Sequence, residues 1–488
     1  MKRVWEKVLL LALCSLLLIP CCHGEEEAAL RYEAEEGRLL GNARVEKVAG
    51  VTFVTGLEQE GDGFAVTVQV ETSGFYDLVF TQKSPTGSYK ENTVLLDGVS
   101  VGSVSVEKNR WQEAALEYVY LTAGEHEIAL KKSWGWVNTD ALVLRPSQAL
   151  PEDLYQVEPT LCNPEASENA RRLMTYLCDC YGQVILSGQY CDEGMYGSEN
   201  ATIWRSSGGK YPAILGLDLI EYSPSRVAHG STSTAVEKAI EYWNQGGIVT
   251  FCWHWNAPEK YITGQWYSAF YTHSSQVDLA AIMEGRDQEG YQLLMEDIDA
   301  IAAQLTRLRD AGVPVLWRPL HEAAGEWFWW GASGSEAYLK LYRLLYDRLT
   351  NEYGLNNLIW VWNGQDAAWY PGDEYVDIIG WDIYPGEHVY SSQAATFLKA
   401  LNCTQSRKLI TLSENGCLMD PEELERDGIW WSYFGTWGGE FVVKNKNFNL
   451  LSEQYTEKSM LEKVYQHERV ITRDELPDLT AYPLRDGN

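Results

Sequence analysis

Short apolar runs alternate with longer amphipathic segments over the last two thirds of the chain. Runs of this kind, bounded by turn residues, are typical of strands buried on both faces. We predict strands at residues 183–188, 213–218, 248–254, 315–321, 358–363, 376–382, 409–414 and 433–437. Periodic apolar positions predict helices at residues 163–181, 233–244, 291–311 and 335–353.

Eight strand–helix units in about 320 residues are typical of a (β/α)8 TIM barrel, an α/β fold. The alternative is a doubly wound sheet. That fold would carry a glycine-rich phosphate turn after its first strand, and no such turn follows residue 188. We therefore predict a barrel domain over residues 154–480, in which polar residues at the carboxyl ends of the strands form the active site.

The pattern is different before residue 147. Strictly alternating apolar and polar positions recur in short runs that are separated by turn pairs such as Asp97-Gly98 and Ala123-Gly124. Over about 120 residues this pattern predicts an all-β sandwich, or jelly roll, at residues 28–147. Residues 147–153 form a short linker, so the chain is expected to hold a β module followed by the barrel.

The first 24 residues are organised as an export signal. Lys2, Arg3 and Lys7 precede an apolar run at 8–19, and this run is too short to span a bilayer. We expect residues 1–24 to be a signal peptide and the protein to be secreted or held at the cell surface. Cys21 or Cys22 could carry a lipid anchor, although Pro20 is unusual before a lipidated cysteine.

Charge and composition restrict the partners. The net charge is −30, and it becomes −32 without residues 1–24, which hold three basic residues and one acidic residue. Such a chain repels nucleic acids and anionic lipids. The 20 tryptophans and 29 tyrosines instead favour a neutral polysaccharide, because aromatic faces stack on sugar rings. The seven cysteines beyond the signal are too scattered for a disulfide framework.

The stretch 315–331, VLWRPLHEAAGEWFWWG, concentrates the candidate chemistry. A buried strand is followed at once by Arg318, His321 and Glu322, and then by four aromatic residues at 327–330. Rings that stack on a sugar, next to polar groups that orient its hydroxyls, make a sugar subsite. The alternative interpretation is a structural glutamate beside a packed aromatic ledge.

A glycosidase needs a second carboxylate, and Glu414 ends another strand-like run, KLITLS. The two glutamates are 92 residues apart, which leaves room for three strand–helix units of about 30 residues each. Glu322 on the fourth strand would then face Glu414 on the seventh across the mouth of the barrel. A separation of about 5–5.5 Å between the carboxyl groups would fit a retaining double displacement.

Four motifs in this order resemble glycoside hydrolase family 26, whose best-known members are endo-β-1,4-mannanases. They are RPLHE at 318–322, WFWWG at 327–331, WDIYP at 381–385 and LSENG at 412–416. The resemblance implies that Glu322 is the general acid/base and Glu414 the nucleophile. It further implies that His254, Tyr384 and Trp437 bind substrate or orient the nucleophile, and the stretch 315–331 itself adds Arg318, His321 and Trp327 to the expected substrate-binding residues.

The two ends of the β module resemble a family 35 carbohydrate-binding module. The motifs are YEAEEG at 32–37 and WGWVNTDALVL at 134–144. The resemblance implies a structural calcium with oxygen ligands, which is the donor type that calcium prefers, from Glu33, Glu35 and Asp140. The alternative is an acidic sandwich edge. Trp134, Trp136 and Asn138 are the expected sugar-binding residues.

The resemblance implies a retaining endo-β-1,4-mannanase that acts on mannan, glucomannan or galactomannan without a catalytic cofactor, and we expect a monomer. Other members of the family cleave mixed-linkage β-glucan or β-1,3-xylan. Two further classes stay open. A non-catalytic carbohydrate-binding barrel would lack one of the two glutamates, and a metal-dependent hydrolase would cluster histidines and aspartates at its strand ends.

Overall fold

The structure, a computed structural model, describes residues 29–485. The predicted signal peptide and the two candidate lipidation cysteines lie outside these residues. In the part described, the seven cysteines are free thiols. No helix of that part is long and apolar enough to cross a bilayer.

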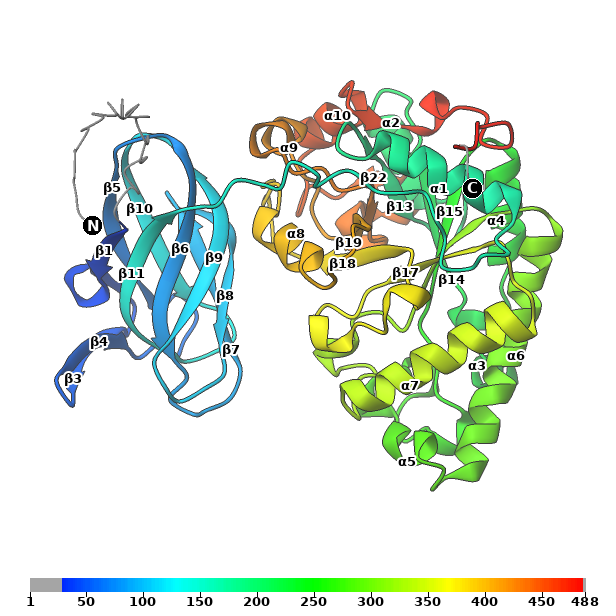
Figure 1. Ribbon diagram of the computed structural model, residues 1–488, viewed down its shortest axis with the longest axis horizontal. Helices are drawn as coiled ribbons and strands as arrows, with labels where there is room; N and C mark the ends of the chain where they lie inside the picture. The colour runs from blue at the N-terminus through cyan, green and yellow to red at the C-terminus, as the bar shows by residue number, and fades with distance from the viewer. Residues whose placement is uncertain (1–28, 486–488) are drawn as a thin grey trace, which may run out of the picture.

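The N-terminal module consists of two antiparallel sheets, as its alternating pattern predicts (Figure 1). One sheet has the order β3-β4-β11-β6-β9, with β1 paired to β11, and the other has the order β2-β5-β10-β7-β8. The inward-facing apolar side chains of both sheets form one core. The strands are β1 Leu30–Glu33, β2 Arg38–Leu40, β3 Arg44–Val48, β4 Val51–Thr55, β5 Gly63–Val70, β6 Gly74–Lys83, β7 Lys90–Leu96, β8 Val99–Val106, β9 Gln112–Leu121, β10 Gly124–Lys132 and β11 Asn138–Pro146.

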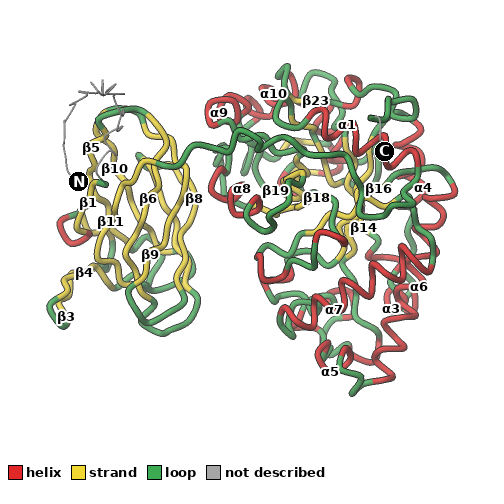
Figure 2. The backbone as a smooth tube through the Cα atoms, viewed as in Figure 1, coloured by secondary structure: helices red, strands yellow, loops and turns green. Residues whose placement is uncertain are grey.

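The larger domain is a closed barrel of parallel strands, so the predicted (β/α)8 fold is confirmed. Figure 2 shows the strands at the centre, with helices around them. The barrel strands are β13 Gly188–Tyr190, β14 Ile214–Asp218, β15 Ile248–Trp253, β16 Val315–Pro319, β17 Leu358–Trp362, β18 Ile378–Ile383, β19 Leu409–Asn415 and β20 Phe434–Thr436. The helices are α1 Glu168–Cys180, α2 Ser198–Ser206, α3 Pro224–Ala228, α4 Ala235–Asn244, α5 Leu279–Met283, α6 Gln288–Asp310, α7 Ser335–Tyr346, α8 Ala394–Leu401, α9 Pro421–Asp427 and α10 Lys458–Gln466.

The first barrel strand is displaced from its predicted position. The apolar run predicted at 183–188 forms the short strand β12 (Ile185–Leu186), which pairs with β23 (Val470–Ile471) outside the barrel. The barrel strand β13 follows it and includes Tyr190. Both segments are buried, and a short apolar run does not indicate which neighbour it will pair with.

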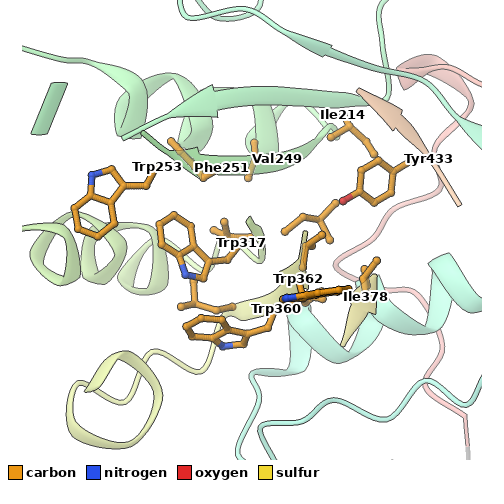
Figure 3. Close-up of a cluster of buried hydrophobic side chains, with 14 of the residues drawn as sticks. Ile214, Val249, Phe251, Trp253, Trp317, Trp360, Trp362, Ile378 and Tyr433 are labelled. Carbon is orange, nitrogen blue, oxygen red and sulfur yellow. The ribbon is translucent and has the colours of Figure 1, made fainter. Parts of the chain in front are cut away.

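Several tryptophans of the barrel strands belong to the hydrophobic core (Figure 3). Trp317 of β16 is the register partner of Trp360 of β17, and both are fully buried. Trp360 packs on Tyr342 and Tyr346, which belong to α7. These rings therefore pack the strands against a helix on the outside of the barrel. Alternate positions of the same strands face the barrel axis.

The module and the barrel pack against each other through β9 and α8. Tyr118 of β9 is buried within the core of the barrel domain, and Ala395 of α8 packs against the core of the module. The guanidinium of Arg426 lies 4.8 Å from the centre of the Tyr120 ring. These contacts join the two domains directly, in addition to the covalent connection.

Candidate active site

Glu322 and Glu414 meet at the carboxyl ends of the fourth and seventh barrel strands. Glu322 follows β16, and Glu414 is the penultimate residue of β19. Carboxylate oxygens of Glu322, Asp382 and Glu414 lie within 4.8 Å of one another. Three acidic groups so close together cannot all be ionised without a strong compensating charge.

Arg318 provides that compensating charge. Its side chain is fully buried and forms ion pairs with Glu414 and with Asp382, the latter at 2.9 Å. It also donates a hydrogen bond of 3.1 Å to the hydroxyl of Tyr190. Burial raises the pKa of Asp382 to about 7, with Arg318 opposing the rise and Glu414 adding to it. One guanidinium thus holds two of the three carboxyl groups in place.

Both oxygens of Glu414 accept hydrogen bonds. Arg318 donates to Oε1, and the hydroxyl of Tyr384 donates to Oε2 at 2.6 Å. A cation and a hydroxyl donor both stabilise the ionised form of a carboxyl group and fix its orientation. Tyr384 is 43% exposed, so this contact lies on the open side of the site.

Glu322 is in a different environment. Trp327 donates from Nε1 to Oε2 at 3.0 Å, and Gln365 donates to Oε1 at 3.4 Å. Burial, followed by the charges of Asp382 and Glu414, raises the pKa of Glu322 well above its usual range, although Arg318 and the Trp327 hydrogen bond oppose the rise. The two glutamates therefore differ in the way that an acid and a nucleophile of one glycosidase must differ.

The backbone around Glu322 has unusual torsions. Leu320, Glu322, Glu326 and Gln365 all have φ values between 53° and 64°, in the left-handed region that non-glycine residues rarely adopt. The amide of Glu322 donates to the carbonyl of Asn363 at 2.7 Å, which ties the loop after β16 to the loop after β17. Strain of this kind persists only where neighbouring contacts maintain it, and it concentrates at functional sites.

His254 and His321 form a second polar network beside the carboxyl groups. Nδ1 of His254 lies 2.6 Å from Asp218 at the end of β14, and its Nε2 lies 3.2 Å from Nε2 of His321. Burial, with smaller contributions from Arg318 and His254, lowers the pKa of His321 well below its usual value, so this imidazole is neutral. Asp218 accepts a hydrogen bond from Nδ1–H of His254 and orients its ring, and a further hydrogen bond joins the Nε2 atoms of the two histidines.

The four consecutive aromatic residues have different environments. Trp327 is 45% exposed and faces the site, whereas Phe328, Trp329 and Trp330 are buried in the core. The predicted aromatic sugar wall is thus wrong for three of the four rings, because local aromatic density does not indicate which side chains point inward. The ring centroid of Trp437 lies 4.7 Å from that of Tyr190 and 5.8 Å from that of His254.

The predicted sugar-binding residues of the module also differ in how far they are exposed. Trp134 is 70% exposed, but Trp136 is half-buried and donates to Thr55 at 2.8 Å. Asn138 begins β11 instead of lying in the loop, and its buried side chain accepts from Thr55. The amide oxygen of Asn138 therefore already has a partner within the module.

The three predicted calcium ligands are not gathered into one cluster. Arg31 forms salt bridges with Glu33 at 2.8 Å and with Asp140 at 2.7 Å. By contrast, one carboxylate oxygen of Glu35 is buried without a hydrogen-bond partner. The donor set is made of oxygens, as calcium requires, but two of the three carboxylates are paired with a cation.

Within residues 29–485, two clusters have the composition of a metal site. One is the carboxylate trio around Arg318, and the other is Asp218, Cys252 and His254. In the first cluster a buried guanidinium already lies against two of the three carboxylates. In the second, Asp218 and the Nδ1 atom of His254 bond to each other. In both clusters the charged groups therefore bond to other side chains and hold them in position.

Asp218, Asp382, Tyr190 and Gln365 contact the predicted residues but were not themselves predicted as site residues. Asp218 and Asp382 each end a predicted strand, so the rule that barrel sites lie at strand ends could have identified them. Tyr190 lies at the end of β13, two residues beyond the end of the predicted first strand. Gln365 lies in a loop after β17 and has no sequence signal of its own.

Comparison with known proteins agrees with this geometry. The profile of glycosyl hydrolase family 26 matches residues 162–475, and that of carbohydrate-binding module family 35 matches residues 30–147. A mannan endo-1,4-β-mannosidase of Thermothelomyces thermophilus is 39% identical over 457 residues, covering 92% of this chain and 91% of that protein. Mannan endo-1,4-β-mannosidase B of Piromyces sp. is 35% identical over 94% of this chain and 79% of its own.

Solved structures agree as well. The crystal structure of the GH26-CBM35 β-(1,4)-mannanase of Podospora anserina is 36% identical, with a TM-score of 0.65 over 92% of this chain and 99% of its own. A β-mannanase from a symbiotic protist of the termite Reticulitermes speratus is 32% identical, with a TM-score of 0.57 over 66% of this chain and 98% of its own. The chain belongs to glycosyl hydrolase family 26, and its barrel is preceded by a family 35 carbohydrate-binding module.

Proposed function

We propose that this glycoside hydrolase is a retaining endo-β-1,4-mannanase that cleaves mannan, glucomannan or galactomannan. The observation that carries the proposal is the carboxyl pair, whose oxygens lie within 4.8 Å. Retaining glycosidases place these groups about 5–5.5 Å apart, whereas inverting enzymes need about 6.5–9.5 Å to admit a water molecule. The family relatives named above as mannanases support β-1,4-mannan as the substrate over mixed-linkage glucan or β-1,3-xylan.

In the first half of the reaction, Glu414 attacks the anomeric carbon of the sugar. The glycosidic bond breaks as Glu322 transfers its proton to the leaving oxygen, and a glycosyl ester of Glu414 remains. Arg318 and Tyr384 orient the attacking carboxylate. The raised pKa of Glu322 keeps its proton available at pH values where an ordinary glutamate has lost it.

In the second half, esterification has removed the charge of Glu414, which contributed to the raised pKa of Glu322. Glu322 can then accept a proton from water, whose oxygen attacks the anomeric carbon and releases Glu414. The sugar has been inverted twice, so its anomeric configuration is retained. We assign His254, His321, Trp327 and Trp437 to substrate binding around the reacting sugar.

The decisive variant is Glu414→Ala. We expect turnover of linear mannan to fall by at least about 10³-fold, because no other group can form the ester. Azide should restore bond cleavage and give a glycosyl azide of inverted configuration. The matched control is Glu326→Gln, which changes an exposed glutamate four residues after Glu322. Undiminished turnover in Glu414→Ala would contradict the assignment.

Chelation of metal ions distinguishes a carboxylate-pair enzyme from a metallohydrolase and from a non-catalytic binding protein. A carboxylate-pair enzyme should release reducing sugar from mannan equally well with and without EDTA. A metallohydrolase would lose its activity, and a non-catalytic binding protein would release no sugar under either condition. We therefore expect no cofactor to be needed for the reaction.

We also propose that Glu35, with Glu33 and Asp140, holds a structural calcium in the module. The oxygen donor set and the unpartnered buried oxygen of Glu35 support this site. The ion would have to displace Arg31 from its two carboxylate partners. Calcium should then raise the melting temperature of the wild type but not that of Glu35→Gln, and equal responses would count against the site.

We propose further that the protein is exported and acts as a monomer outside the cell or at its surface, after loss of residues 1–24. Support comes from the basic flank and apolar run of that segment, and from a polysaccharide substrate too large to enter a cell. We place the module at residues 28–147 and the catalytic domain at 154–480. N-terminal sequencing of the exported protein tests the cleavage position.

A further inference from the structure

A cavity of about 1030 Å³ separates the module from part of the barrel. Its barrel side is formed by α8 and by the loops that follow β17 and β18. Two of its lining residues, Gln365 and Tyr384, are the side chains that hydrogen-bond to Glu322 and Glu414. The cavity therefore borders the active site.

The module side of this cavity is the outer face of β7 and β8. Glu91 and Thr93 of β7 lie opposite Ser105 and Ser103 of β8, and all four line the cavity. The alternate residue Asn92 is buried on the other face. A wall of hydroxyl and carboxylate groups fits a ligand with many hydroxyls and does not fit an apolar one.

The aromatic ring that the module contributes to this cavity is held in place. Tyr89 is half exposed, and its hydroxyl donates to Glu91 at 2.6 Å. Ser103 donates to the other oxygen of the same carboxylate. A fixed ring next to oriented hydrogen-bonding groups is the arrangement that binds a pyranose unit. Ser133 also lines the cavity, and it immediately precedes the exposed Trp134.

Direct packing joins the two walls of the cavity. The contacts that surround Tyr118, Ala395 and Arg426 hold β9 of the module against α8, which itself lines the cavity. A module that only tethered the enzyme to a polymer would not need to present a polar face to the catalytic site.

We propose that the module and the barrel form one continuous mannan-binding cleft, in which β7 and β8 bind sugar units of the same chain that is cleaved at Glu322 and Glu414. Tyr89 and Glu91 provide the outermost contacts of this cleft. The inference rests on the proposed mannanase function. The occupant is a single β-mannan strand, which passes Tyr384 and Gln365 and continues over the face of the module.

The test compares short and long soluble substrates on the full-length enzyme. Ser105→Trp places a large ring in the cavity, and Tyr89→Ala removes the aromatic platform. We expect kcat/KM for long soluble mannan fragments to fall at least about tenfold in Ser105→Trp and about fivefold in Tyr89→Ala. Values for mannotetraose cleavage should stay within about twofold of wild type.

The matched control is Thr67→Trp, which adds the same ring at an exposed position of β5 that does not line the cavity. It should leave both substrates unaffected. Equal kcat/KM values for wild type and Ser105→Trp on long soluble fragments would overturn the inference. A loss confined to insoluble mannan would overturn it too, because that result describes an independent anchor. A wild type inactive on every mannan would instead refute the proposed function.

Discussion

At the scale of single residues, the site depends on one buried arginine among three carboxyl groups. Arg318 pairs with Asp382 and Glu414, whereas Glu322 has only neutral donors, Trp327 and Gln365. A carboxyl group that is desolvated without a cation of its own retains its proton. The division of labour between the two glutamates thus follows from which of them contacts the guanidinium.

This asymmetry has a consequence for stability. The folded protein raises the pKa of Glu322, whereas the unfolded chain leaves it near its ordinary value of about 4.3. Above that value the unfolded chain ionises this group more readily than the folded protein does. The free energy of unfolding therefore falls as pH rises from the unfolded pKa toward the folded pKa. We expect Glu322→Gln to raise the melting temperature by a few degrees at pH 7.

The same substitution should have little effect on the melting temperature at about pH 3.5, where Glu322 is protonated in both states. Calorimetry of wild type and Glu322→Gln at the two pH values measures this difference. Glu326→Gln serves as the control, since that side chain is exposed. A gain that is equally large at both pH values would mean that packing, and not ionisation, is responsible.

At the scale of secondary-structure elements, parallel strands bring distant residues to one edge. β14 ends at Asp218, and β15 ends just before His254, so the neighbouring strand ends join these two side chains. The connection then passes to His321 after β16. Three successive strands thus contribute one residue each to a single hydrogen-bonded row beside the catalytic pair.

We expect Asp218→Asn to lower kcat/KM on mannan by about 10–100-fold, because an amide no longer selects the Nδ1–H tautomer of His254. If Asp218 acts through His254, the double variant Asp218→Asn/His254→Ala should be no less active than His254→Ala alone. Steady-state kinetics of the wild type, the two single variants and the double variant provide this double-mutant cycle. Fully additive losses would show that Asp218 acts independently of the histidine.

The sequence predicts those site residues that directly follow a buried strand. Glu322 and Glu414 each follow an apolar run, so their convergence could be expected from the barrel alone. The buried positions of Trp329 and Trp330 could not be predicted, because side-chain direction after a strand depends on left-handed backbone torsions such as those of Leu320 and Glu322. Gln365 reaches Glu322 only through the fold of a loop that has no periodic pattern.

At the scale of the whole molecule, the two domains form one structure. Tyr118 lies at a register shift between β6 and β9, with a φ of 61°, and its ring stacks on Phe75 at 4.1 Å. This irregularity directs a module side chain into the core of the catalytic domain. The hydrophobic pattern thus predicts two domains in sequence, while side-chain packing joins them in space.

The left-handed torsion of Tyr118 predicts an unusual order of stability. Truncation of the ring should cost about 3–5 kcal/mol in Tyr118→Ala. Tyr118→Gly should be more stable than Tyr118→Ala by about 1 kcal/mol, since glycine adopts this φ without strain. In a regular strand the order is reversed. Denaturant unfolding of the full-length variants measures the difference, and a less stable glycine variant would contradict the strained conformation.

The ion pairs of Arg318 have a final consequence for the catalytic cycle. With Glu322 protonated, the catalytic pair Glu322 and Glu414 carries one negative charge beside the guanidinium of Arg318. Formation of the glycosyl ester neutralises Glu414 at the step in which Glu322 gives up its proton, so the total is again one negative charge. The negative charge thus moves from Glu414 to Glu322, while the net charge of the pair stays constant through each half-reaction. The glycosyl-enzyme intermediate therefore requires no counterion from solvent.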